Sequence, residues 1–199
     1  MFVIVNLRRY RVFIVIIITV LIVATLIMLP PFLLKNMYPL KYKDIVEQYS
    51  MEYNIDFYLV MAIIKVESNF DKNAVSHKGA KGLMQLTGQT AQWGAQALNL
   101  SDYTSDKVYD PETNIKIGCW YINRLMQEFD NDLTLVLAAY NGGSGNVNKW
   151  LQDKNLSSSG KTLDKIPFKE TENYVKKVIR EYHVYKKLYQ NKTTGGQVK

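Results

Sequence analysis

The chain has 199 residues, of which 47% are hydrophobic and 22% charged, and its formal net charge is +7. This length and apolar share predict one folded domain of ordinary size and exclude a disordered chain. A mildly basic chain suits an anionic polymer or a membrane surface, but no run of Lys and Arg with interleaved aromatic residues indicates nucleic-acid binding. Cys119 is the only cysteine, so we expect neither an internal disulfide nor a cysteine metal cluster.

The N-terminal region predicts a membrane anchor. In residues 12–29 the only polar side chains are two threonines, and a span of about 20 apolar residues crosses a bilayer as a helix. A cleaved signal peptide is the alternative, but residues 29–48 contain no Ala, Gly or Ser that would serve as a cleavage site. Three Arg before residue 12 favour a cytoplasmic N-terminus, although Lys residues on the far side weaken this preference.

These features predict how the chain is divided. We expect residues 1–37 to be a cytoplasmic stub and an uncleaved signal anchor that crosses the cell membrane once. Residues 38–191 would form the main domain on the extracytoplasmic, cell-wall side of the membrane. Residues 192–199 are expected to be a flexible tail.

The main domain is predicted to be mainly α-helical, since no alternating strand pattern of any length occurs in it. Asp56 suits the N-cap of a helix that reaches Glu67, and Asp110 followed by Pro111 begins another helix well. The other expected elements are an entry region with helical spacing at 38–58, a polar loop at 71–81, an Ala-rich helix at 90–98, a helix at 133–140 stopped by Asn141-Gly142-Gly143, a short helix at 146–151, a loop at 154–165 and a last helix from about Thr171. The last helix carries a stripe that should pack on the body, formed by Tyr174, Val178, Tyr182, Tyr185 and Tyr189.

Glu67 stands where an apolar stripe should continue. Val60, Ile63 and Ile64 follow the i, i+3, i+4 spacing of a buried helix face, and Glu67 takes the i+7 position. A buried, unpaired carboxylate costs several kcal/mol, so the pKa of Glu67 should rise, as a general acid near neutral pH requires. The alternative is a glutamate at the helix end that turns to solvent, and this feature alone leaves both interpretations open.

The sequence lacks the motifs of other common catalytic sites. His77 and His183, the only histidines, are far apart, and no HExxH motif, serine nucleophile elbow or phosphate-binding glycine loop occurs. We therefore expect no metal and no cofactor. One buried carboxylate with glycines, amides and tyrosines near helix ends suits the binding of a carbohydrate.

Several short motifs resemble the soluble lytic transglycosylase family in their order and approximate spacing. They are Glu67-Ser68, Ala74-Val75-Ser76 with Gly79-Ala80, Gly82-Leu83-Met84-Gln85, Asp110-Pro111 with Asn114-Ile115, Gly118 and Tyr121, Ala139-Tyr140-Asn141, and Glu170-Thr171 with Tyr174-Val175. The resemblance covers roughly residues 42–190. One departure is Gly88, where the family usually has a proline that would fix the start of the next helix, so we expect a local cost in stability rather than in activity.

The resemblance implies a lysozyme-like, mainly helical catalytic domain that acts on the glycan strands of peptidoglycan. The family cleaves the β-1,4 bond between N-acetylmuramic acid and N-acetylglucosamine without water and leaves a 1,6-anhydro ring on the muramyl product. Ordinary glycosidases need two carboxylates, whereas attack by the substrate's own C6 hydroxyl needs only one. Glu67 would act first as the general acid and then as the base.

The resemblance also implies the residues that bind substrate. They are Ser68, Met84, Gln85, Tyr140, Asn141, Glu170 and Tyr174. Three of them have a structural alternative: Met84 in core packing, Tyr174 in the packing stripe, and Glu170 at a helix N-terminus.

Three other functions stay open. A muramidase of the same fold would hydrolyse the same bond with water. A wall-binding module would have lost activity. A membrane-tethered assembly factor would open the wall for a secretion or conjugation apparatus, a function that is compatible with catalysis.

Overall fold

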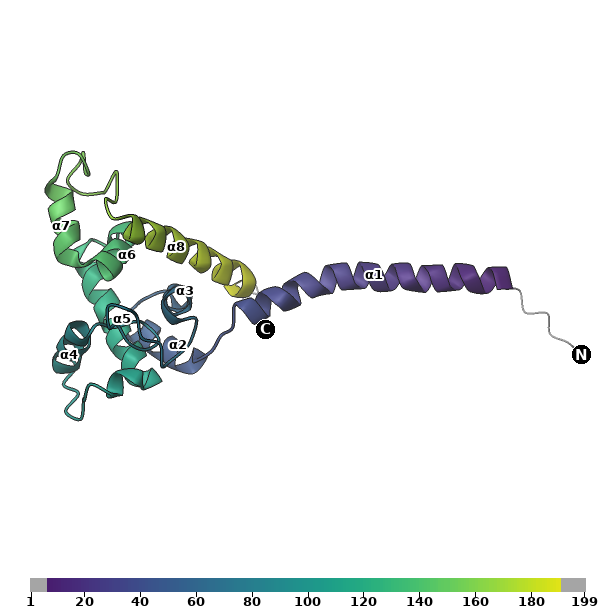
Figure 1. Cartoon of the computed structure of the whole chain (residues 1–199), viewed down its shortest axis with the longest axis horizontal. Helices are drawn as coiled ribbons and strands as arrows, with labels where there is room; N and C mark the ends of the chain where they lie inside the picture. The colour runs from purple at the N-terminus through teal and green to yellow at the C-terminus, as the bar shows by residue number, and fades with distance from the viewer. Residues whose placement is uncertain (1–6, 191–199) are drawn as a thin grey trace, which may run out of the picture. The chain divides into compact units, whose positions relative to one another are not determined.

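The computed structural model describes residues 7–190, apart from the side chains of residues 7–9, 12 and 27–32. Residues 1–39 and residues 40–199 form two compact units (Figure 1). The first residues of the expected cytoplasmic stub and the expected tail at 192–199 lie outside the described residues. The main domain is mainly helical, as predicted.

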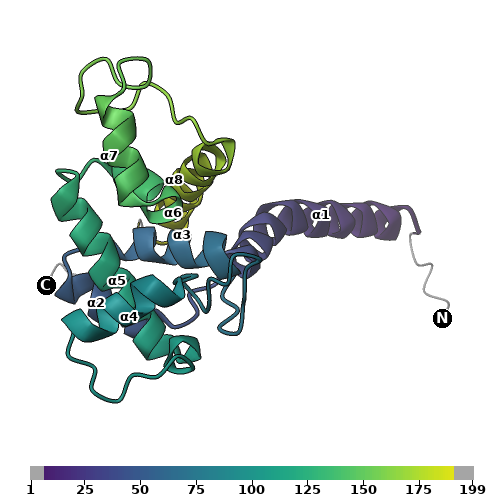
Figure 2. The same cartoon turned by 60° about the vertical axis from the view of Figure 1, so that its left-hand side comes forward.

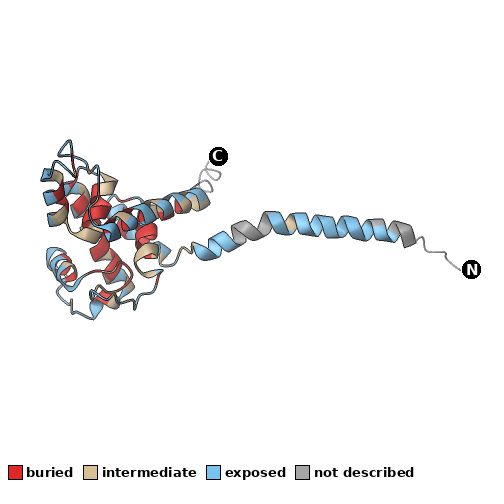
Figure 3. Ribbon diagram, turned by 45° about the horizontal axis from the view of Figure 1, so that its top comes forward, coloured by how far each residue is buried: buried red, intermediate tan, exposed pale blue. Residues whose placement is uncertain are grey.

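The first unit contains helix α1, Leu7–Met37. Its described side chains are mostly exposed and include large apolar residues such as Phe13, Leu21 and Leu26 (Figure 3). Within the described residues, no helix combines the length and the apolar character needed to cross a membrane. The structure therefore gives the expected anchor no support of its own.

The second unit is built from helices, and its described residues contain only isolated β-bridges besides them. In chain order the elements are α2 Lys43–Glu52, α3 Phe57–Ser68, α4 Gly88–Ala97, the short 3₁₀ helix η1 Lys107–Tyr109, α5 Pro111–Glu128, α6 Leu133–Gly142, α7 Ser144–Gln152 and α8 Lys169–Tyr189. Helix α3 lies in the middle of this unit and packs most extensively against α8 (Figures 1 and 2). Its residues 59–64 are all buried, which places its C-terminal end firmly in the domain.

The helix starts follow the capping signals of the sequence. The side chain of Asp56 accepts a hydrogen bond from the backbone N–H of Tyr58 at 2.8 Å, and that of Asp110 accepts one from Thr113 at 2.9 Å. Helix α4 begins at Gly88, two residues earlier than expected, because the side chain of Thr87 caps it. A threonine cap thus stabilises the helix start at which the family's proline is missing.

Helix α2 lies inside the entry region at 38–58, where the sequence has helical spacing. Its start has no sequence signal, because the helix has no side-chain cap and follows Tyr42, which has left-handed backbone angles. One element differs from the prediction. Helix α6 was expected to stop before Asn141, but it continues through Gly142. The left-handed backbone of Gly143, with φ +86°, ends it.

The stripe on the last helix is confirmed in its central part. Tyr174, Val178 and Tyr185 are buried, while Tyr182 and Tyr189 are half-buried. Helix α8 packs on α3 and α6. Its first turn therefore lies near the end of α6, and this brings the predicted residues of the two helices together.

Candidate active site

Glu67 lies in the last turn of α3. The helix ends directly after it, because Asn69 and Phe70 adopt left-handed backbone angles, with φ of 50° and 66°. The buried Phe70 fixes this turn against the core. The Glu67 side chain is half-buried, so the helix end holds it at the edge of the interior rather than turned freely to solvent.

Burial raises the pKa of Glu67 to about 7. The hydroxyl of Tyr174 and the positive charge of Lys177 act in the opposite direction, because both favour the charged carboxylate. Among the described residues, no second carboxylate contributes to this shift. The sequence-based prediction of a raised pKa is thus confirmed, and its main cause is the loss of solvent.

Two tyrosine hydroxyls face this carboxyl group. Burial, and then the charge of Glu67, raise the pKa values of Tyr140 and Tyr174 well above the ordinary value of 10.0. Tyr140 donates a hydrogen bond to the carbonyl oxygen of Met84 at 2.7 Å. The Tyr174 hydroxyl is close enough to influence Glu67, yet it makes no well-formed hydrogen bond within the described part of the chain.

The loop that follows α3 is folded back on itself by backbone pairing. Lys81 and Leu86 exchange two hydrogen bonds of 2.9 and 3.0 Å, so the residues between them form a tight turn. Gly82 is required in this turn: its φ is +76°, and an added Cβ would lie 2.3 Å from the side chain of Asn114.

The side chain of Asn114, in α5, holds this turn in place by hydrogen bonds. Its side chain is fully buried and fully engaged: Oδ1 accepts a hydrogen bond from the backbone N–H of Met84, and Nδ2 donates to the carbonyls of Val108 and Lys81. The sequence motif that contains Asn114 therefore has a mechanical role, because it places the turn opposite the end of α3.

Ser68, Met84 and Gln85 make contacts that hold the turn in place. The Ser68 hydroxyl donates to the carbonyl of Leu83 at 2.8 Å, which ties the helix end to the turn. The Gln85 amide donates to the carbonyls of Ala74 and Gly82. Met84 is completely buried, and an added Cβ on Gly118 would lie 2.2 Å from its sulfur. Its packing role is therefore visible, whereas an apolar wall toward the sugar stays a prediction.

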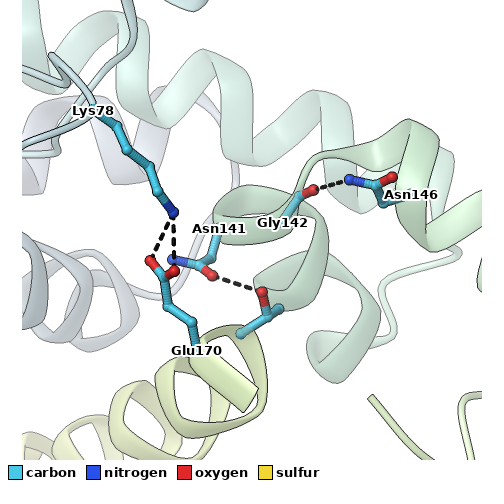
Figure 4. A network of polar contacts seen from close by, with 6 residues as sticks. Lys78, Asn141, Gly142, Asn146 and Glu170 are labelled. Atoms are coloured by element: carbon cyan, nitrogen blue, oxygen red, sulfur yellow. Dashed lines mark hydrogen bonds and ion pairs between the residues drawn. The ribbon is translucent and has the colours of Figure 1, made fainter. Parts of the chain in front are cut away.

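Asn141 and Glu170 lie close together at the other side of the site (Figure 4). The Oδ1 atom of Asn141 accepts a hydrogen bond from the Thr171 hydroxyl at 2.8 Å, so the end of α6 is joined to the start of α8. Glu170 forms an exposed ion pair with Lys78, with Nζ–O distances of 2.9 and 3.1 Å, and Lys78 holds the pKa of Glu170 below its usual value. The pair ties α8 to the loop after α3.

A groove of about 540 Å³ opens beside Tyr140 and Asn141. Its walls come from the first half of α4, from Tyr121 of α5, and from residues 140–145 at the junction of α6 and α7. Its volume lies in the range of small-molecule sites, and its lining combines aromatic rings with hydroxyl and amide groups. Of the predicted site residues only Tyr140 and Asn141 line this groove; the lining does not include Glu67, Ser68, Met84, Gln85, Glu170 or Tyr174.

Thr171, which bonds Asn141, lies in a motif of the family resemblance but had no role assigned to it. Sequence reasoning did not find two other residues near the site: Trp93 lines the groove, and Lys78 pairs with Glu170. Only Trp93 had a signal of its own, as a single large aromatic residue in a helix otherwise made of small and polar residues. The described residues contain no group of three or more His, Cys, Asp or Glu side chains that could hold a metal ion.

The fold and the site define a helical domain that presents one half-buried glutamate near a groove lined by polar and aromatic groups. The chain belongs to the transglycosylase SLT domain family, whose family model matches residues 44–161. It is 35% identical over 167 residues to the soluble lytic murein transglycosylase of Escherichia coli K12, an alignment that covers 81% of this chain and 25% of that protein. It is 36% identical over 118 residues to a membrane-bound lytic murein transglycosylase C of Photorhabdus laumondii, covering 54% of this chain and 32% of that protein.

Solved structures show the same fold. The 70-kDa soluble lytic transglycosylase of Escherichia coli superposes with a TM-score of 0.70 at 34% identity, covering 77% of this chain and 25% of that one. An inactive mutant of the lytic transglycosylase Slt of Pseudomonas aeruginosa gives a TM-score of 0.70 at 27% identity, covering 82% and 26% of the two chains. The chain thus spans about a quarter of the length of these soluble relatives.

Proposed function

We propose that this protein is a peptidoglycan lytic transglycosylase in which Glu67 is the only catalytic carboxylate. The carrying observation is the placement of Glu67, which is half-buried at the end of α3 with its pKa raised to about 7 by burial, while the described residues that line the neighbouring groove include no Asp or Glu. A retaining or inverting hydrolase of the ordinary kind needs two such groups. The relatives are named as murein transglycosylases, and the inactive Pseudomonas aeruginosa mutant carries a glutamine in place of a glutamate.

In this proposal the reaction needs one proton donor and no water. Protonated Glu67 gives its proton to the glycosidic oxygen as the bond from that oxygen to C1 of N-acetylmuramic acid breaks. The 2-acetamido group of the sugar stabilises the positive charge that develops at C1. The C6 hydroxyl oxygen then bonds to C1, its proton returns to Glu67, and a 1,6-anhydro ring results.

Tyr174 and Lys177 support the second half of this cycle. Both favour the charged carboxylate, and charge on Glu67 appears once its proton has been given away. The buried Tyr174 hydroxyl has no other well-formed partner among the described residues, so donation to the carboxylate costs no existing bond. Tyr174 thus keeps the pKa of Glu67 near neutrality instead of higher.

The other predicted residues would position the sugar. Tyr140 and Asn141 line the groove, so they would hold the ring and N-acetyl groups near the cleavage point. Ser68 and Gln85 would hydrogen-bond the sugar or Glu67 through polar atoms that are not used within the loop. Met84 would supply an apolar wall of the site. Glu170 would contact the glycan or its peptide from the start of α8.

Membrane attachment is the part of the proposal that rests on sequence. The apolar segment at residues 12–29 is long enough to span a bilayer. The name of the Photorhabdus laumondii relative describes a membrane-bound protein. The enzyme would then act on glycan strands close to the membrane, on its cell-wall side. Extraction of membranes with alkaline carbonate tests this, because a chain that spans the bilayer stays in the pellet.

The mass of the sugar product tests the reaction type. Purified peptidoglycan is digested with the full chain and with Glu67→Gln, and the soluble fragments are analysed by mass spectrometry. We expect anhydro-muropeptides from the parent and none from the variant. Fragments heavier by one water would identify a muramidase, and full activity of Glu67→Gln would reject Glu67 as the catalytic acid.

A further inference from the structure

A row of aromatic side chains runs along the groove and begins at Tyr140. Tyr140, which interacts with the charge of Glu67, has its ring centroid 5.5 Å from that of Tyr121. The Tyr121 centroid is in turn 6.2 Å from that of Trp93. All three residues line the same groove. The aromatic wall therefore leads from the catalytic carboxyl group to Trp93.

Trp93 is unusually exposed for a residue of its size. Its relative exposure is 46%, while the domain buries most of its other large aromatic rings at least halfway. Exposure of an apolar indole face to water is energetically unfavourable. An exposed aromatic face in a groove is therefore typical of a ligand contact. Thr87, Gln89 and Thr90 stand beside it in the groove lining and supply hydroxyl and amide groups.

The ring is also held rigidly. Trp120 contacts it edge-to-face with centroids 4.8 Å apart, and the guanidinium of Arg124 lies over it at 6.0 Å. The next residue, Gly94, lets α4 approach α5 so closely that an added Cβ would lie 2.5 Å from Ile117. Binding of a ligand that stacks on Trp93 would therefore lose little affinity to the entropy cost of immobilising the ring.

We propose that Trp93 forms a glycan-binding subsite at the far end of the groove, on which a sugar ring of the strand stacks while neighbouring polar groups of α4 bind its hydroxyls. This inference rests on the proposed function, since it concerns the same strand that Glu67 cleaves. The subsite is remote from the reacting bond, so it contributes binding only for strands long enough to reach it. The enzyme should consequently prefer long glycan strands over short fragments.

Binding measured in a Glu67→Gln background separates this subsite from catalysis. Titration calorimetry compares Trp93→Leu with the Glu67→Gln parent, using purified long glycan strands and a tetrasaccharide fragment as probes. We expect Trp93→Leu to weaken binding of the long strands about tenfold and binding of the tetrasaccharide less than twofold. Trp93→Phe should restore most of the loss, because it returns an aromatic face. Gln96→Ala, an exposed change one turn along α4 and outside the groove, is the matched control and should change neither affinity.

The outcomes are distinguishable from those of the product analysis. Equal weakening for both strand lengths, no weakening at all, or no binding of either probe by the parent would overturn the subsite. Binding by Trp93→Phe that is no stronger than binding by Trp93→Leu would show that the aromatic face does not matter and would also overturn it. A parent with wild-type Glu67 that releases water-containing products would reject the transglycosylase reaction while leaving the strand-length comparison valid.

Discussion

The buried side chain of Asn114 and the backbone of Met84 are joined by a hydrogen bond of 2.8 Å from the Met84 N–H to Oδ1. Together with the two donations of Nδ2 to the carbonyls of Val108 and Lys81, this bond makes α5 the support of the turn opposite Glu67. The end of α3 and the turn are then tied by the hydrogen bond from the Ser68 hydroxyl to the Leu83 carbonyl. The site thus depends on an amide that never reaches the groove lining.

Replacing Asn114 by Ala should disrupt this support. The change would leave the buried Met84 N–H and the Val108 carbonyl without the Asn114 side chain, while the Lys81 carbonyl keeps its bond from Leu86. Each unsatisfied buried group costs about 1–3 kcal/mol. We expect a loss of about 3 kcal/mol in the free energy of unfolding, measured by denaturant titration of tryptophan fluorescence. Cell-wall cleavage should fall more than tenfold under conditions where the variant is still folded.

Asn123→Ala is the control on the same helix. Asn123 is half-buried and donates a single hydrogen bond, to the carbonyl of Tyr53 at 2.9 Å. Its loss should cost about 1 kcal/mol and leave the specific activity of the folded protein unchanged. If both variants lost the same stability and activity, the special role of Asn114 would be rejected.

The sequence predicted the helices with clear start signals and the raised pKa of Glu67 on its apolar stripe; the catalytic role of Glu67 stays a prediction. Asp56 and Asp110 cap as expected, because an N-cap depends on a few neighbouring residues only. The packing partners were harder to predict from the sequence. Gly118 and Met84 are in close contact but lie 34 positions apart in the chain, so no local sequence pattern indicates their contact. The Lys78–Glu170 pair and the Trp93 wall were missed for the same reason, since they exist only once the helices are packed.

Gly118→Ala tests the contact between α5 and Met84. A Cβ at this position would lie 2.2 Å from the sulfur and 2.7 Å from the terminal carbon of the Met84 side chain, which is fully buried. Overpacking of this kind typically costs about 1–3 kcal/mol, and the shifted Met84 should also move the turn and lower activity. Gly88→Ala is the matched control, because its Cβ would meet no atom within 4 Å. Equal unfolding free energies for the two variants would contradict the close packing.

Activity should fall as the pH rises through about 7. Glu67 must be protonated at the start of the reaction, and its pKa is raised to about 7. The pH dependence of kcat/KM on soluble glycan strands should therefore show a falling limb near that value. A profile that stays flat between pH 5 and pH 9, about two units on either side of the pKa, would exclude Glu67 as the acid.

Tyr174→Phe should move this limb to higher pH. The Tyr174 hydroxyl lowers the pKa of Glu67, so its removal raises that pKa and extends the acid form upward. Lys177→Gln should shift the limb in the same direction, because the lysine charge also favours the carboxylate. Lys176→Gln, which removes an exposed partner of Glu172, should leave the limb where it is. A downward shift in Tyr174→Phe would show that the hydroxyl stabilises the protonated form instead.

Glu67→Gln should make the domain more stable at alkaline pH. The folded state holds the proton of Glu67 up to a pKa of about 7, against an ordinary value of 4.5, so the folded chain binds more protons than the unfolded chain between these values. Stability conferred by the protonated carboxyl is consequently lost as the pH rises from 4.5 to 7, and a shift of this size corresponds to about 3 kcal/mol. Glutamine carries no such cost. Denaturant titrations should therefore give nearly equal unfolding free energies for parent and variant at pH 4.5, and a more stable variant above pH 7. The exposed control Glu128→Gln should show no such pH-dependent gain. A parent as stable as Glu67→Gln at alkaline pH would mean that Glu67 is solvated in the folded protein.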